Sequence, residues 1–172
     1  MPVGRFKNMV PIQRLVHWLD QKRFGAIDPT APLGARGEQA AARLLRRKGL
    51  RIIAVNESDR AGEIDLIAID RKTRTIIFVE VKTLRRQPPS GIRGGESSAD
   101  ASQDHPADRV DERKQRRITQ AALRFLKRRG LLGSACRFDV VAVWWPEDTA
   151  DPAYIQHIEH AFEASGEFQM WS

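Results

Sequence analysis

The stretch IDLIAIDRKTRTIIFVEVKT, residues 64–83, decides the fold. Two apolar, β-branched runs at 64–69 and 75–83 predict strands, and the polar residues between them predict a connecting turn. Because side chains alternate along a strand, Ile76 shares one face with every second residue, and Ile77 lies on the other face. Both faces of the second run are apolar, so we expect this strand at the centre of a sheet that is covered on both sides.

Charged side chains interrupt the apolar pattern near the end of the second strand. Glu80 and Lys82 share one face there, where burying an unpaired charge is costly. If the strands pair through a two-residue turn at Lys72 and Thr73, counting outward places Asp65 opposite Glu80. Facing carboxylates repel each other, and a divalent cation between them relieves that repulsion. Hard oxygen ligands favour Mg²⁺ or Mn²⁺.

Two alternatives stay open for these acids. The turn carries neither Gly nor Asn, so a different register would keep both carboxylates on one face without opposing them, or would separate them. The charges could also form a structural ion pair near the end of the strand. We favour the metal site, because two acids and Lys82 converge at the end of apolar runs.

Two further charged residues are expected near the same place. Glu38 begins a helix on its inward face, and Lys114 lies four residues before Ile118 on the inward face of a later helix. Such side chains either contribute to a site or extend to solvent from the helix ends. Both interpretations stay open for Lys114, whereas a buried carboxylate needs a partner more strictly, which favours the site for Glu38.

The remaining segments predict how the sheet is completed. Their periodicity predicts helices over 37–48 and 110–129 and strands over 50–55, 138–144 and 154–162. Three consecutive strands favour an antiparallel meander, and the second helix is long enough for a crossover to a parallel fourth strand. The predicted fold class is α/β, with a mixed central sheet flanked by helices in the order α-β-β-β-α-β.

Composition limits the class of protein. The 172 residues fit one domain with a single core, and 41% hydrophobic with 30% charged residues is typical of a globular chain. We expect no membrane span, because no apolar run approaches roughly 18 residues, and the single cysteine excludes an internal disulfide framework. No secretory signal pattern is seen, so we expect a cytoplasmic protein. A net charge of +7 favours a polyanionic partner such as nucleic acid.

Three parts of the chain differ in character. Residues 1–33 are predicted to form a basic N-terminal extension, residues 34–162 the main domain, and residues 163–172 a C-terminal tail. Within the domain, residues 85–109 are rich in Pro, Gly and Ser with few apolar anchors. A loop of this length is either functional or disordered, and we expect it to be flexible.

Several motifs resemble the YraN-like family of uncharacterised bacterial proteins. They are Gly37-Glu38-Gln39-Ala40-Ala41, Gly62-Glu63-Ile64-Asp65-Leu66-Ile67, Phe78-Val79-Glu80-Val81-Lys82-Thr83, Arg137-Phe138-Asp139-Val140-Val141 and the stretch 157–162. The resemblance covers about residues 34–162 and implies the restriction-endonuclease-like fold of the PD-(D/E)xK superfamily, near archaeal Holliday-junction resolvases. The chain departs from that pattern in two places. Ile64 stands where the superfamily motif has proline, and the loop at 85–109 is longer than the family usually carries.

The resemblance also implies metal-dependent hydrolysis of phosphodiester bonds. In that superfamily a helix glutamate, a strand aspartate and a Glu-x-Lys run the reaction, and they match Glu38, Asp65, Glu80 and Lys82. We expect Mg²⁺ or Mn²⁺ bound by Asp65, Glu80, Glu38 and the backbone carbonyl of Val81, with Glu63 in an outer position. Contacts to nucleic acid, with DNA as the favoured partner, are expected from Arg60, Arg85, Arg86 and Lys114.

We therefore expect a nuclease-like protein that acts on nucleic acid, with a homodimer suggested by analogy to resolvases. The alternative is a non-catalytic protein that retains the fold. Such a protein would bind nucleic acid or act as a partner in repair or DNA uptake. Salt-dependent binding without metal-dependent cleavage would favour that alternative.

Overall fold

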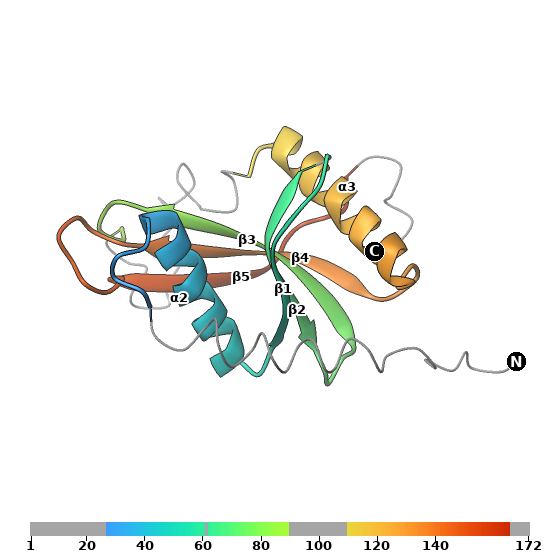
Figure 1. Ribbon diagram of the computed structural model, residues 1–172, viewed down its shortest axis with the longest axis horizontal. Coiled ribbons are helices and arrows are strands. Elements are labelled where there is room, and N and C mark those ends of the chain that lie inside the picture. The colour runs from blue at the N-terminus through green and yellow to red at the C-terminus, as the bar shows by residue number, and fades with distance from the viewer. Residues whose placement is uncertain (1–26, 61, 90–109, 166–172) are drawn as a thin grey trace, which may run out of the picture.

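The computed structural model describes residues 27–60, 62–89 and 110–165 (Figure 1). These residues form two helices and five strands: α2 (Leu33–Arg47), β1 (Arg51–Ser58), β2 (Glu63–Asp70), β3 (Thr75–Leu84), α3 (Glu112–Arg129), β4 (Cys136–Trp144) and β5 (Tyr154–Phe162). The α/β class with a mixed sheet is confirmed, and the order is compatible with a restriction-endonuclease-like core. Neither described helix is both long and apolar enough to cross a membrane.

Parts of the predicted segments fall outside this description. Most of the predicted N-terminal extension (1–26), most of the predicted flexible loop (90–109) and the end of the predicted tail (166–172) lie outside the described residues.

The five strands lie in one sheet in the order β1-β2-β3-β4-β5. β1, β2 and β3 pair antiparallel as a meander, and β4 pairs parallel to β3 after the crossover through α3. β5 then pairs antiparallel to β4. The sheet is therefore mixed, as three consecutive strands followed by a long helix predict.

The register of β2 and β3 is the one that counting outward from the turn predicts. Backbone pairs run from Asp70 with Thr75 to Leu66 with Val79. The connection itself differs from the expected two-residue turn, because pairing stops at Asp70 and Thr75 and four residues, 71–74, make the bend. Arg74 adopts a positive φ of 60°, and the carboxylate of Asp70 accepts the backbone N–H of Lys72 at 2.8 Å. An Asp at this point favours such a turn without glycine.

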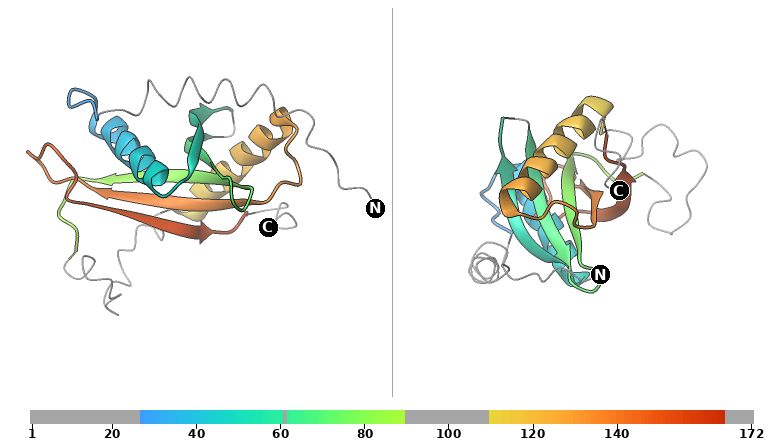
Figure 2. Two further views of the ribbon diagram at one scale, coloured as in Figure 1. Left: turned by 90° about the horizontal axis from the view of Figure 1, so that it is seen from below. Right: turned by 90° about the vertical axis from the view of Figure 1, so that its right-hand side faces the viewer.

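Two apolar clusters cover the two faces of the sheet. On one face, Ala41 and Leu45 of α2 pack against Leu66 and Val79. On the other, residues of α3 pack against Phe78 and its neighbours. Figure 2 shows α2 and α3 on either side of the β1–β2 pair. β3 is thus covered on both faces, which its continuous apolar pattern predicts.

The first helix begins earlier than its periodicity indicates. Expected from Gly37, α2 starts at Leu33, and Pro32 occupies the N-cap position. Proline and glycine next to a helix start do not break it, since the first backbone N–H groups have no partner within the helix. Ile27 and Leu33 also pack against the core, so tertiary contacts add a first turn that a local pattern misses.

Candidate functional site

An open hollow of about 640 Å³ lies at the C-terminal end of β3. Four elements or turns contribute to it: the start of α2, the β2 strand, β3 and the residues just after β3. Its lining consists of Pro32, Leu33, Gly34, Glu38, Asp65, Glu80, Val81, Lys82, Thr83 and Arg85. All four predicted catalytic residues, Glu38, Asp65, Glu80 and Lys82, therefore meet in one place.

Asp65 stands where β2 and β3 part. Backbone pairing ends at Leu66 and Val79, one step before Asp65 and Glu80. Beyond this last backbone pair, the carboxylate of Asp65 accepts the backbone N–H of Val81 at 2.7 Å. This hydrogen bond fixes the carboxylate beside the hollow, because it satisfies a backbone donor that the parting strand leaves unpaired.

Glu80 is buried among cations from two elements. Its side chain is only 4% exposed, and Lys114 of α3 places Nζ 3.1 Å from Oε2. Lys82 lies farther away, with Nζ 3.7 Å from Oε1. Apart from the ion pair with Lys114, this buried oxygen has no hydrogen-bond partner in the part of the chain that the structure describes. An acceptor in that state favours an additional ligand.

The pKa of Asp65 responds to its surroundings. Burial, followed by the neighbouring Glu80 carboxylate, raises this pKa from 3.8 to about 7. The Val81 N–H and the Lys114 ammonium act in the opposite direction on this pKa, while Glu38 adds a smaller upward effect. A carboxyl group whose pKa is raised to near 7 by burial and a second acid is typical of a functional site.

Close packing between α2 and β3 determines where Glu38 lies. A Cβ atom at Gly37 would overlap the hydroxyl oxygen of Thr83, so only glycine lets the helix approach β3 at this point. Glu38 is the next residue and lines the hollow. The approach of the helix backbone thus brings the predicted third carboxylate to the same side of the sheet as the other two.

The residues present fit a divalent cation in part. Two carboxylates converge, and one carries a buried oxygen without a hydrogen bond, as a hard cation prefers. Across residues 27–60, 62–89 and 110–165, no group of three or more His, Cys, Asp or Glu side chains is gathered closely enough to hold a metal ion. Glu38 therefore lines the hollow without completing a three-acid cluster.

The other predicted contact residues divide into two groups. Arg85 is exposed and lines the hollow, and Lys114 reaches Glu80 directly. Glu63 and Arg60 are exposed but do not line the hollow, and Arg86 is half-buried just beyond it.

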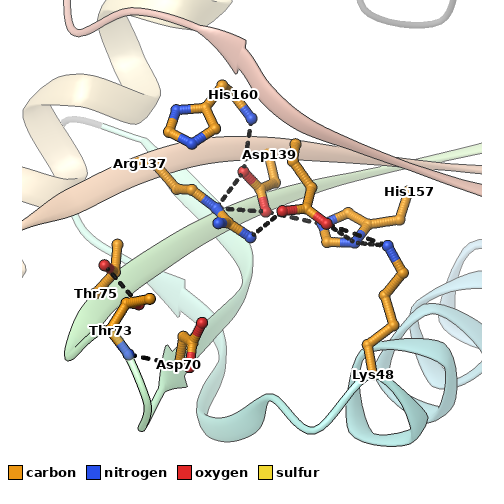
Figure 3. Close-up of polar contacts among 9 residues, drawn as sticks. Lys48, Asp70, Thr73, Thr75, Arg137, Asp139, His157 and His160 are labelled. Atoms are coloured by element: carbon orange, nitrogen blue, oxygen red, sulfur yellow. Dashed lines mark hydrogen bonds and ion pairs between the residues drawn. The ribbon is translucent and has the colours of Figure 1, made fainter.

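A second polar cluster, missed by sequence reasoning, lies on β4 and β5 (Figure 3). Asp139 is fully buried and accepts from Nε of Arg137 at 3.0 Å, while Nε2 of His157 lies 2.8 Å from its carboxylate. The backbone N–H of His160 and the side chain of Lys48, which lies 3.0 Å from Nδ1 of His157, extend the cluster. The available signal was an acid inside an apolar strand, the same signal that marks Glu80.

A more enclosed cavity of about 270 Å³ lies between α3 and the β4–β5 pair. Its lining is mainly apolar, including Leu126, Phe138 and Phe162. Glu163 is the only carboxylate among its lining residues, so it offers no paired acids. The open hollow, which holds the converging charges, is therefore the candidate functional site.

Comparison with known proteins finds a matching family and similar proteins from bacteria. The model of the uncharacterised protein family UPF0102 matches residues 37–143, a span that holds all four predicted catalytic residues. A UPF0102 protein of Rhodopirellula baltica is 58% identical over 154 residues, covering 90% of this chain and 84% of the relative. A UPF0102 protein of Geobacter sulfurreducens is 42% identical over 131 residues, covering 76% and 88%. The chain therefore belongs to the UPF0102 family, which is the YraN-like family that its motifs resemble.

Proposed function

We propose that this protein is a metal-dependent nuclease that hydrolyses phosphodiester bonds in nucleic acid at the open hollow. The observation that carries the proposal is the convergence of Asp65 and Glu80, with the pKa of Asp65 raised to about 7. A buried acid beside a half-buried one is unfavourable unless a cation or a proton joins them. The basic net charge of +7 supports a polyanionic substrate.

Asp65 and Glu80 would hold the cation, Mg²⁺ or Mn²⁺, with the Val81 carbonyl as a further ligand. When bound, the cation would neutralise charge on the phosphate oxygens and acidify a water molecule. The Val81 N–H keeps Asp65 in place, and Lys114 keeps Glu80 in place.

The remaining side chains would act on the phosphate and the attacking water. Lys82 lines the hollow, so its ammonium can stabilise the negative charge that develops on the phosphate, or orient the water. Glu38 lies across the same hollow and can hold the water or a second ion. Arg85 at the rim can contact a neighbouring phosphate, which positions the strand without reading its sequence.

Cleavage assays test the proposal directly. Branched, flapped and linear DNA is incubated with wild type and with Asp65→Asn in Mg²⁺, in Mn²⁺ and in EDTA. We expect metal-dependent cleavage by wild type and a loss of about 100-fold or more in Asp65→Asn. Asp70→Asn, an identical change on the same strand away from the hollow, should cleave like wild type. Equal cleavage by Asp65→Asn would contradict the assignment.

One observation favours a second candidate function, a nucleic-acid-binding protein without cleavage. Glu80 already lies next to two ammonium groups, those of Lys114 and Lys82, so its charge is balanced within the chain. Binding that weakens with salt, together with no cleavage in either metal, would identify this second function.

A further inference from the structure

Acidic partners pair with two arginines in the C-terminal half of α3. Arg128 pairs with Glu57 and Asp59 at the end of β1, and Arg124 lies 3.9 Å from the carboxylate of Asp59. Arg124 and Arg128 thus hold β1 and have little charge left for an external partner. Lys127 and Arg129 in the same half are exposed, but they lie at the far end of the helix from Lys114 and the hollow.

The first turns of α3 keep their positive charge. Arg113 and Arg117 are exposed and lie one helical turn apart on the same face. Neither has an ion pair with any side chain that the structure describes. The two acids that precede Arg113 in sequence are occupied elsewhere, since Glu112 pairs with Arg116 at 3.2 Å and Asp111 caps the helix by accepting a backbone N–H at 2.7 Å.

This unneutralised charge adjoins the hollow. Lys114 follows Arg113 in the chain and contacts Glu80 in the candidate site. On the other side, Gly62 packs so closely on Arg117 that a Cβ at Gly62 would lie 3.3 Å from the Arg117 carbonyl oxygen. The same turn holds Arg60, which is exposed. We call Arg60, Arg113 and Arg117 the α3 patch.

We propose that the α3 patch binds the sugar–phosphate backbone of the nucleic acid whose scissile bond lies in the hollow. The proposal rests on the proposed function and deepens it by naming the surface that holds the substrate. Charge alone does not select this side, because α2 also exposes two arginines, Arg43 and Arg47, at the same spacing. What selects α3 is its continuity with the site through Lys114, whereas Arg43 and Arg47 lie in the half of α2 beyond Glu38.

The test compares two double variants of the full chain that remove the same charge. Arg113→Ala/Arg117→Ala changes the α3 patch, and Arg43→Ala/Arg47→Ala is the matched control on α2. Binding to labelled branched and linear DNA is measured by fluorescence anisotropy in EDTA between 50 and 200 mM salt. The exposed positions allow both variants to fold, which circular dichroism and thermal melting check.

We expect the α3 double variant to bind about tenfold more weakly, and its plot of log affinity against log salt to lose a slope of about two. The α2 control should stay within about twofold of wild type. Equal weakening of both variants, unchanged binding by the α3 variant, or no binding by wild type would overturn the proposal. A wild type that does not cleave in Mn²⁺, together with the expected weaker binding of the α3 variant alone, would contradict the nuclease activity and still support nucleic-acid binding by the α3 patch.

Discussion

The carboxylate of Asp65 accepts the backbone N–H of Val81, with Oδ2 2.7 Å from the nitrogen. This contact joins β2 to β3 one step beyond their last backbone pair, Leu66 with Val79. The acid is thus held by the sheet itself, next to Glu80, rather than by a mobile side chain partner. A site built on strands in this way is more precisely positioned than one on loops.

Replacing Asp65 with Asn should stabilise the metal-free protein at neutral pH. Burial and Glu80 raise the pKa of Asp65 to about 7, so the native state binds its proton more tightly than the unfolded chain. The wild type therefore loses stability as pH rises from about 4 to about 7, by up to about 4 kcal/mol. Asn removes this loss and can still accept the Val81 N–H. Urea denaturation in EDTA at pH 4, 6 and 8 measures the difference.

The matched control is Asp70→Asn on the same strand. Hydrogen bonds from the 71–74 turn lower the pKa of Asp70, so its contribution to stability is lost as pH falls. This variant should gain nothing at pH 8. An Asp65→Asn variant that is no more stable than wild type at pH 8 would contradict the raised pKa of Asp65.

Removing Lys114 should leave a buried charge poorly compensated. Its ammonium is the nearest cation to Glu80, whose side chain is 4% exposed, and Lys82 is farther away. We expect Lys114→Met to lose about 1–3 kcal/mol in the free energy of unfolding in EDTA. Mn²⁺ should stabilise this variant more than wild type, because the cation no longer competes with an ammonium for Glu80. Melting temperatures with and without Mn²⁺ check both effects.

The double variant Lys114→Met/Glu80→Gln serves as the control for that experiment. Neutralising Glu80 removes the buried charge that Lys114→Met leaves without its nearest cation, so most of the lost free energy of unfolding should return. If Lys114→Met alone were as stable as wild type, Lys114 would not compensate the charge of Glu80.

Two glycines of α2 should respond in opposite ways to alanine. At Gly37 a Cβ overlaps the Thr83 side chain, so Gly37→Ala should cost about 1–3 kcal/mol and displace Glu38. At Gly34 nothing lies within 4 Å, so Gly34→Ala should gain up to about 1 kcal/mol from helix propensity. Urea denaturation measures both changes. A harmless Gly37→Ala would mean that close packing on Thr83 does not position the helix.

The cluster on β4 and β5 should contribute to stability and not to cleavage. Asp139→Ala leaves Arg137 and His157 without their buried partner, which should cost about 3 kcal/mol or more. Cleavage per folded molecule should stay within a few-fold of wild type, because the cluster lies outside the hollow. Glu159→Gln, an exposed change beside the same cluster, should cost less than about 1 kcal/mol. Loss of cleavage in folded Asp139→Ala would assign the cluster a functional role.

Local sequence patterns predict the fold and the site where the interacting residues lie close together in the sequence. Counting outward from the turn in 64–83 predicts the register of β2 and β3, one of the registers left open, and that register brings Asp65 next to Glu80. Helical spacing likewise predicts that Glu38 and Lys114 face the sheet.

Other features depend on contacts between distant residues and could not be predicted in that way. Ile27 and Leu33 pack on the core and help to start α2 at Leu33, ahead of the periodic pattern that begins at Gly37. The partners of Asp139 come from β4 and β5, so its buried cluster has no local periodicity.

Anomalous diffraction from crystals soaked in Mn²⁺ tests the central claim most directly. The account predicts a Mn²⁺ peak in the open hollow, coordinated by carboxylate oxygens of both Asp65 and Glu80, which disappears in Asp65→Asn crystals soaked in the same way. Density that shows no ion at these acids, with Lys114 still next to Glu80 at saturating Mn²⁺, would contradict it.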